Sequence, residues 1–202
     1  KQGRTFPKVT VTHKAEQSIA ADIRVVSAEP YENGGLVDVL SLKGSYLGTG
    51  FFNDHSKIRV RLISRNANDT FDEAFFERRL RYAWDYRKAV MGPDASCCRV
   101  IFGESDEFPG LTVDRFGNIL VTQTLSLGIE KLKPMLFPLL VRVLTEDGQQ
   151  IDGIFERNDV GIRRLEGMEQ NKGFFPLPDM PVPPSTKTEI TENGIRYTVD
   201  FE

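Results

Sequence analysis

The sequence contains few of the side chains from which metal centres and nucleophilic sites are usually built. It has two histidines, His13 and His55, and two cysteines, Cys97 and Cys98, which are adjacent. Neighbouring cysteines rarely bridge each other, and no Cys/His spacing typical of a zinc site occurs. We therefore predict no metal and no disulfide framework. A buried, inert role for the cysteine pair is favoured over that of a nucleophile, and the cytoplasm is the expected compartment.

The sequence also lacks long apolar runs and the common phosphate-binding and hydrolase motifs. No apolar run approaches ~20 residues, so no membrane span is predicted. The stretch KQGRTFPKVTVTHK at the start has neither an apolar h-region nor a small-residue cleavage site, so we expect no secretory signal. G-x-x-x-x-G-K-[ST], G-x-G-x-x-G and G-x-S-x-G are all absent, which leaves no candidate catalytic residue.

Charge is distributed unevenly along this chain, whose net charge is -3. Residues 1–65 hold ten Lys+Arg and six Asp+Glu, a net of +4, whereas residues 66–202 hold sixteen and twenty-three, a net of -7. The asymmetry suggests a basic module joined to an acidic one. A basic module with one cationic face is a candidate for contact with phosphate.

Residues 57–62 alternate strictly between charged and apolar side chains. The charged set is Lys57, Arg59 and Arg61, and the apolar set is Ile58, Val60 and Leu62. A period of two predicts a β-strand with one buried face and one cationic outer face. Such a face is either a solvated surface or a contact for a nucleic-acid backbone, and the residues alone leave both open.

The arrangement of predicted elements indicates an α+β protein. Short strands broken by glycine turns run from residue 8 to 64 and favour a small β-barrel. A helix should follow, capped by Asp69 or Thr70 and ended by Gly92-Pro93. Its apolar stripe is expected to consist of Phe75, Phe76, Leu80, Tyr82, Ala83 and Tyr86.

Residues 98–167 have the pattern of a compact strand–helix–strand unit. Three strands precede a helix at residues 128–146, and Pro138 is expected to kink that helix or restart it. The proline-rich stretch at 174–187 then leads to two alternating strands that meet at Asn193-Gly194, a strong hairpin signal. Two strands alone are marginal, so we expect this hairpin to be ordered only through contact with another element.

Charged side chains are dense between residues 156 and 166. The candidates for a cleft are Glu156, Arg157, Asp159, Arg163 and Arg164. Clusters of this kind are usually ion-paired surface, and a functional cleft is the alternative. Residues 104–107 form a second, acidic cluster, for which an ordinary loop is favoured over acid–base chemistry.

Several segments occur in the order found in one known family. They include KVTVTHKAEQSI, NDHSKIRVRL, FFERRLRYAWDYRKAV, GESDEFPGLTVDRFG, GIFERNDVGIRRLEGM and TENGIRYTVDF. Through them, nearly the whole chain resembles the bacterial rRNA cytosine-C5 methyltransferases, which combine an N-terminal PUA domain, a central α+β domain and a C-terminal Rossmann-like domain. The resemblance implies rRNA as partner and S-adenosylmethionine as cofactor of the full-length enzyme.

The resemblance favours RNA binding by the cationic strand. Lys14 and His55 are further candidates beside it, and the alternative for His55 is that it caps a turn. The set is Lys14, His55, Lys57, Arg59 and Arg61. Family members usually carry a Gly-His-Pro-Trp type segment after the KAEQSI helix, whereas here Ile19 leads directly into DIRVV. The chain stops where the family continues into its cofactor domain, so we expect no catalytic residue and no cofactor site within these 202 residues.

These inferences give an expected organisation. Its parts are a PUA-like RNA-binding domain at 1–66, a connecting helix at 67–96, a central α+β domain at 97–172, and a linker with a hairpin at 173–202. The expected function is the RNA-binding, cleft-framing part of an S-adenosylmethionine-dependent methyltransferase that acts on cytosine C5 of large-subunit rRNA. A stand-alone RNA-binding module and a protein-interaction scaffold with a merely solvated strand are the alternatives.

Overall fold

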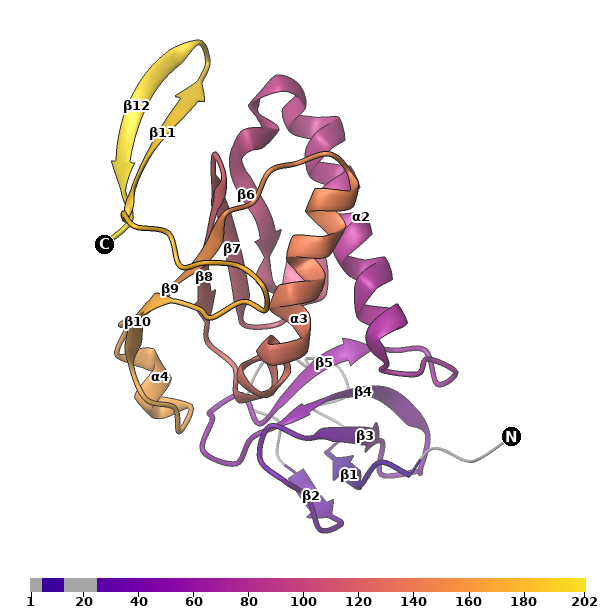
Figure 1. Ribbon diagram of the computed structural model, residues 1–202. Coiled ribbons are helices and arrows are strands. Elements are labelled where there is room, and N and C mark those ends of the chain that lie inside the picture. The colour runs from indigo at the N-terminus through magenta and orange to yellow at the C-terminus, as the bar shows by residue number, and fades with distance from the viewer. Residues whose placement is uncertain (1–4, 13–24) are drawn as a thin grey trace.

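The computed structural model describes residues 5–12 and 25–202. In this part of the chain, two five-stranded sheets and a two-stranded hairpin form around two long helices (Figure 1). The N-terminal sheet lies at one end of the molecule, and the helices rise from it along the second sheet (Figure 1). The expected α+β class is confirmed.

The N-terminal sheet has the strand order β2-β1-β3-β4-β5. Its strands are β1 (Lys8–Val11), β2 (Val25–Ala28), β3 (Leu36–Leu40), β4 (Tyr46–Phe52) and β5 (Val60–Ser64). The β1 and β3 strands pair in parallel, and the other neighbours are antiparallel. Within the described residues no pairing joins β2 to β5, so the sheet is open and the predicted closed barrel is wrong. Glycine-punctuated strands predict a small sheet, but they do not determine whether its edges meet.

The strand predicted at 57–62 begins later than expected, at Val60. Residues 53–59 form a loop, because side chains bond to backbone groups that a strand would have paired. Asn53 Oδ1 accepts from the His55 N–H at 3.1 Å, and Ser56 Oγ accepts from the Ile58 N–H at 3.1 Å. Of the three cationic residues, Arg61 alone lies in β5.

The α2 helix (Glu73–Met91) is capped by Asp72, whose side chain accepts from the Phe75 N–H. The expected cap Asp69 instead accepts from Ser64 Oγ at 2.6 Å. The apolar stripe is also shifted, since Trp84 is buried whereas Tyr82 and Tyr86 are exposed. Trp84 Nε1 donates to Asp147 at 2.8 Å, which satisfies its polar atom and stabilises its burial.

The central sheet has the order β10-β9-β8-β7-β6. Its strands are β6 (Cys97–Phe102), β7 (Leu111–Phe116), β8 (Ile119–Thr124), β9 (Gly153–Asn158) and β10 (Asn171–Phe174). The α3 helix (Leu127–Glu146) links the parallel strands β8 and β9, and α2 and α3 lie side by side next to this sheet (Figure 1). The stretch at 160–168 contains the single-turn helix α4 (Ile162–Leu165).

The α3 helix runs through both of its prolines without interruption, so the restart considered at Pro138 does not occur. Pro138 cannot donate a backbone hydrogen bond, which weakens the helix at that turn. Its neighbours Phe137 and Leu139 are buried, as are Leu136 and Leu140. Packing of this apolar face therefore outweighs the lost hydrogen bond, as is common for helices in a core.

The C-terminal hairpin consists of β11 (Lys187–Glu192) and β12 (Ile195–Asp200). Asn193 and Gly194 both have positive φ, as the Asn-Gly signal predicts. The strands are mostly exposed, but Ile190 and Phe201 are buried. The Phe201 ring lies 5.1 Å from that of Phe155 in β9, so the hairpin is attached to the central unit by apolar contacts.

The N-terminal sheet has a small core of its own and also contributes to the larger core beneath the helices. Phe51 of β4 and Ile63 of β5 belong to the same buried cluster as the inner faces of α2 and α3. The Phe51 ring lies against Gly128 in the first turn of α3, where an added Cβ would be 2.1 Å from the ring. Gly128 is therefore needed because the helix must approach the ring closely, and this contact fixes the N-terminal sheet against α3.

We expect Gly128→Ala to destabilise the chain by about 1–3 kcal/mol, because the new methyl group overlaps the Phe51 ring. Gly161→Ala is a matched control: Gly161 has φ -62°, and no atom lies near its missing Cβ. The control should stay within about 0.5 kcal/mol of the parent. Urea unfolding measures both, and equal stabilities of the two variants would contradict the close packing at Gly128.

Candidate nucleic-acid interface

The loop at residues 53–59 presents two cations to solvent. Lys57 and Arg59 are exposed, and neither forms an ion pair with another residue in the part of the chain that the structure describes. His55 is also exposed, with its Nε2 3.7 Å from Asp54 Oδ1. Lys14, the remaining predicted RNA-binding residue besides Arg61, lies outside the described residues.

Hydrogen bonds from a neighbouring loop hold this cationic loop in place. Asn33 Nδ2 donates to Asp54 Oδ1 at 2.7 Å, and the Tyr31 hydroxyl donates to Asp54 Oδ2 at 3.0 Å. These bonds lower the pKa of Asp54, Asn33 contributing most, and the bond to Asp54 raises the pKa of Tyr31. The backbone near Lys57 and Arg59 is therefore fixed before any partner binds.

Arg61 does not share an outer face with Lys57 and Arg59, which corrects the sequence prediction. Its guanidinium lies 3.1 Å from the carboxylate of Glu166 and 3.3 Å from that of Glu104. Glu166 is buried and also accepts from Ser56 Oγ at 2.6 Å, while Asn53 Nδ2 donates to the Glu166 carbonyl at 2.8 Å. This arrangement, which we call the Glu166 junction, attaches the loop and β5 to the segment after α4.

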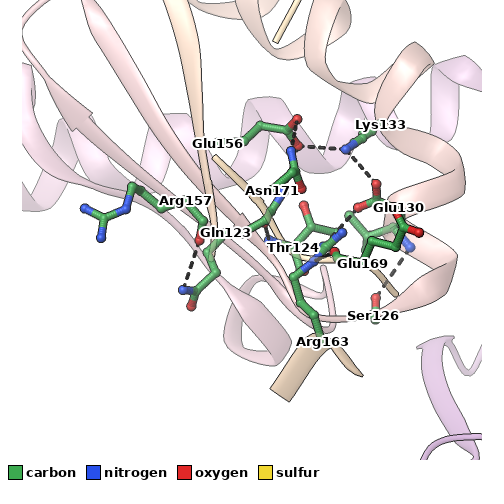
Figure 2. Close-up of polar contacts among 12 residues, drawn as sticks. Gln123, Thr124, Ser126, Glu130, Lys133, Glu156, Arg157, Arg163, Glu169 and Asn171 are labelled. Atoms are coloured by element: carbon green, nitrogen blue, oxygen red, sulfur yellow. Dashed lines mark hydrogen bonds and ion pairs between the residues drawn. The ribbon is translucent and has the colours of Figure 1, made fainter. Parts of the chain in front are cut away.

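The predicted cleft residues fall into two groups, and the first is buried. Glu156 and Arg163 are 5% and 2% exposed, so they are not the cleft-facing residues that the sequence suggested. Lys133 Nζ lies 2.7 Å from carboxylate oxygens of both Glu156 and Glu130, and Arg163 lies 3.1 Å from Glu130 (Figure 2). Some of the charged residues clustered between positions 156 and 166 are therefore buried in the core. This is possible because Glu130 and Lys133 of α3, which are distant in sequence, pair with them.

The buried network is well satisfied. Arg163 donates to the carbonyls of Thr124 at 2.6 Å and Glu169 at 2.7 Å, and Asn171 donates to Glu156 at 3.2 Å (Figure 2). Burial alone would raise the pKa of Glu130, but hydrogen bonds from Lys133 and Arg163 outweigh it and hold that pKa below its ordinary value. The network fixes α4 against the central sheet and so positions Glu166.

The second group faces a hollow on the sheet. Arg157 pairs with Asp159 at 3.1 Å, which lowers the pKa of Asp159, and Figure 2 shows the Arg157 side chain pointing away from the buried network. Both residues line a hollow of about 460 Å³. Arg99, Asp114 and Gln123 of the central sheet also line it, as do Asp200, the last residue of β12, and Phe201 after it. Arg164 is exposed elsewhere in α4.

A second hollow of about 300 Å³ lies at the junction of the two sheets. Arg61, Phe102, Glu104 and Ile162 line it, and Thr112 of β7 lines both hollows. Sequence reasoning missed Phe102, Thr112 and Gln123. The alternation of residues in β7 and β8 predicts which side chains face away from the helices. It does not predict that this outer face of the sheet contains a hollow.

Neither cysteine is suited to nucleophilic chemistry. Burial raises the pKa of both the Cys97 and the Cys98 thiols, which agrees with the inert role favoured by the sequence. Residues 5–12 and 25–202 contain no cluster of side chains able to hold a metal ion. Over the same ranges, no helix has the length and apolar character needed to cross a bilayer.

Comparison with known proteins gives these surfaces a context. Residues 9–65 match the family model of a PUA-like domain. Curated relatives include ribosomal RNA large subunit methyltransferase I of Alteromonas mediterranea, 35% identical over 170 residues, and of Cronobacter sakazakii, 36% identical over 170 residues. The matches cover 84% of this chain but only 40% and 41% of those proteins, so the chain spans about two fifths of their length.

Two solved structures share the fold. One is a proposed SAM-dependent methyltransferase from Streptococcus mutans, with a TM-score of 0.69 and 19% identity. The other is a proposed methyltransferase in complex with SAH, with a TM-score of 0.73 and 18% identity. Each match covers 96% of this chain, and 48% and 47% of the respective neighbours. The arrangement of sheets, helices and hairpin is therefore one that longer methyltransferase chains also contain.

We expect Lys133→Met to destabilise the fold by about 3 kcal/mol, because it leaves the buried Glu156 carboxylate without its cation. Lys131→Met is the matched control on the same helix, since Lys131 pairs only with the exposed Glu32. Loss of that pair should cost at most about 1 kcal/mol. Thermal and urea unfolding compare the two, and equal losses would contradict a structural role for the buried network.

Proposed function

We propose that this chain is the RNA-binding, cleft-framing part of an S-adenosylmethionine-dependent rRNA methyltransferase that acts on cytosine C5 of large-subunit rRNA. The observation that carries the proposal is the pair of exposed cations, Lys57 and Arg59, which form no ion pair among the described residues and lie on a hydrogen-bonded loop within a PUA-like match. The similarity to ribosomal RNA large subunit methyltransferase I supports rRNA as the partner. The cytosine specificity rests on the family resemblance of the sequence.

Charge pairing distinguishes this loop from most of the basic side chains of α2. Arg79, Arg81, Arg87 and Lys88 pair with carboxylates, and Arg78 is the one basic residue of α2 without an ion pair among the described residues. Arg142 of α3 pairs with Glu73 and Glu77 of α2. Paired cations have little charge left to attract phosphate, whereas Lys57 and Arg59 keep theirs. We therefore assign phosphate contact to the loop and not to α2.

The cofactor and the catalytic groups are assigned to the part of the relatives' length that this chain does not match. That assignment is supported by the 40% coverage of the relatives and by the lack of a glycine-rich phosphate-binding motif in the sequence. The role left to this chain is to hold RNA and to supply one wall of a cleft. A cytosine carbon in a helix is reached only when the base is unpaired or extruded.

Replacing Lys57 and Arg59 together by Gln should weaken binding to a single-stranded large-subunit rRNA fragment. Each lost phosphate contact should reduce the slope of log affinity against log salt by about 0.7, so the slope falls by up to about 1.4. The weakening should be similar across RNA sequences, and stability should change by less than about 1 kcal/mol because both side chains are exposed.

Lys88→Gln with Arg142→Gln is the control, because it removes the same net charge from cations that are already paired. Its salt slope should stay near that of the parent. If both double variants lose slope equally, net charge and not this loop attracts RNA. If neither does, the cations at 57 and 59 are a solvated surface and the proposal fails.

A separate prediction tests the assignment of the cofactor. Calorimetry of this chain with S-adenosylmethionine should give no binding heat, because the sequence has no candidate loop for the cofactor. S-adenosylhomocysteine in place of S-adenosylmethionine provides the matching titration. A micromolar dissociation constant with either ligand would place the cofactor site within these residues and overturn the assignment.

A further inference from the structure

The hollow at the junction of the two sheets has the size and lining of a small ligand site. Its volume is about 300 Å³, at the lower end of the range for small-molecule pockets. The walls combine an aromatic ring, Phe102, with an aliphatic side chain, Ile162, and two charged groups, Arg61 and Glu104. Both apolar residues are exposed, at 54% and 47%, so their side chains are accessible to a ligand in the hollow.

Phe102 is held in position by its neighbours. The Arg99 guanidinium lies 5.1 Å from the centroid of the Phe102 ring, and Asp114 accepts two hydrogen bonds from Arg99, at 2.8 and 3.0 Å. The Phe102 N–H donates to Asp106 at 2.7 Å. Arg99 thus covers one face of the ring and holds its orientation, so a planar group that stacks on the remaining exposed face would cost little conformational entropy.

Arg61 and Glu104 add hydrogen-bonding capacity at the same place. Arg61 is held by the buried Glu166, so its guanidinium is fixed as a donor. Glu104 is mostly exposed and contacts Arg61 at 3.3 Å, which leaves carboxylate lone pairs free to accept from a ligand. An aromatic surface beside one donor and one acceptor matches the face and the edge of a nucleobase.

The geometry points to a subsite for one unpaired nucleobase of the bound RNA, stacked on Phe102 with an exocyclic amino group donating to Glu104. This inference rests on the proposed RNA-binding function. A carboxylate accepts from the N4 amino group of cytosine, whereas uracil offers an oxygen at that position. The subsite should therefore prefer an amino-bearing base.

The location of the hollow supports an RNA strand as the source of the base. Arg61 is two residues from Arg59, so their Cα atoms are at most about 7 Å apart. The cationic loop and the hollow are therefore neighbours along the chain, within reach of one RNA strand. The strand β6, which ends at Phe102, points toward the N-terminal sheet that carries this loop (Figure 1).

The first test uses single-stranded RNA that contains 2-aminopurine, whose fluorescence falls when it stacks. The chain has one tryptophan, Trp84, which is buried, so the probe can be followed without an exposed indole nearby. We expect the parent to quench the probe and Phe102→Ala to lose the quenching and about 5- to 150-fold in affinity. The salt slope should not change, because no phosphate contact is removed.

Two further variants serve as controls for Phe102→Ala. Phe102→Trp should keep the quenching, because the aromatic surface remains. Tyr82→Ala removes an equally exposed aromatic side chain from α2 and should leave both quenching and affinity unchanged. If Phe102→Ala binds and quenches as the parent does, or if Tyr82→Ala loses as much, the subsite is overturned.

The second test concerns the edge of the base. Glu104→Ala should reduce the preference for cytosine over uracil in otherwise identical oligonucleotides by about 5-fold or more. An unchanged preference would overturn the role of Glu104. If the variants at 57 and 59 lose salt dependence while those at 102 and 104 behave as the parent, the subsite fails and the proposed function stands. If the parent binds no RNA, both fail.

Discussion

The position of the cationic loop depends on one buried carboxylate, that of Glu166. Three side chains from residues 53–61 donate to its carboxylate, those of Asn53, Ser56 and Arg61, and Asn53 also donates to the Glu166 carbonyl. A buried carboxylate is costly unless such partners satisfy it, so the loop and the segment after α4 cannot separate without exposing an unpaired charge. The interaction therefore sets where Lys57 and Arg59 lie relative to the central sheet.

The buried polar network beside the central sheet fixes the segment that carries Glu166. Arg163 fixes α4 through backbone carbonyls and Glu130, and Lys133 joins Glu130 to Glu156. Because Phe51 also packs on Gly128, apolar and polar contacts both attach the N-terminal sheet to α3 and α4. The cations, the junction hollow and the larger hollow on the sheet thus lie on parts of the chain that these contacts hold together.

Much of the fold can be predicted from local sequence patterns, whereas the candidate site is predicted less well. Periodicity located α2, α3 and most strands, and Asn193-Gly194 located the hairpin, because these signals act over a few residues. The start of β5 was misplaced because Asn53 and Ser56 bond to the loop backbone, and alternation cannot reveal that competition. Glu156 and Arg163 were assigned to a cleft because their partners on α3 lie more than twenty residues away in sequence.

The C-terminal hairpin forms part of the larger hollow on the central sheet. Its position is therefore linked to whether a ligand occupies that hollow. Val199, Asp200 and Phe201 form part of the wall of that hollow, while most of the hairpin is exposed and held to the sheet chiefly through Ile190 and the Phe155–Phe201 contact. Any ligand in the hollow that touches these three residues stabilises the hairpin in its present place. By thermodynamic reciprocity, anything that holds the hairpin there tightens binding in the hollow by the same factor. The position of the hairpin and binding at the sheet surface on which it rests are thereby thermodynamically coupled.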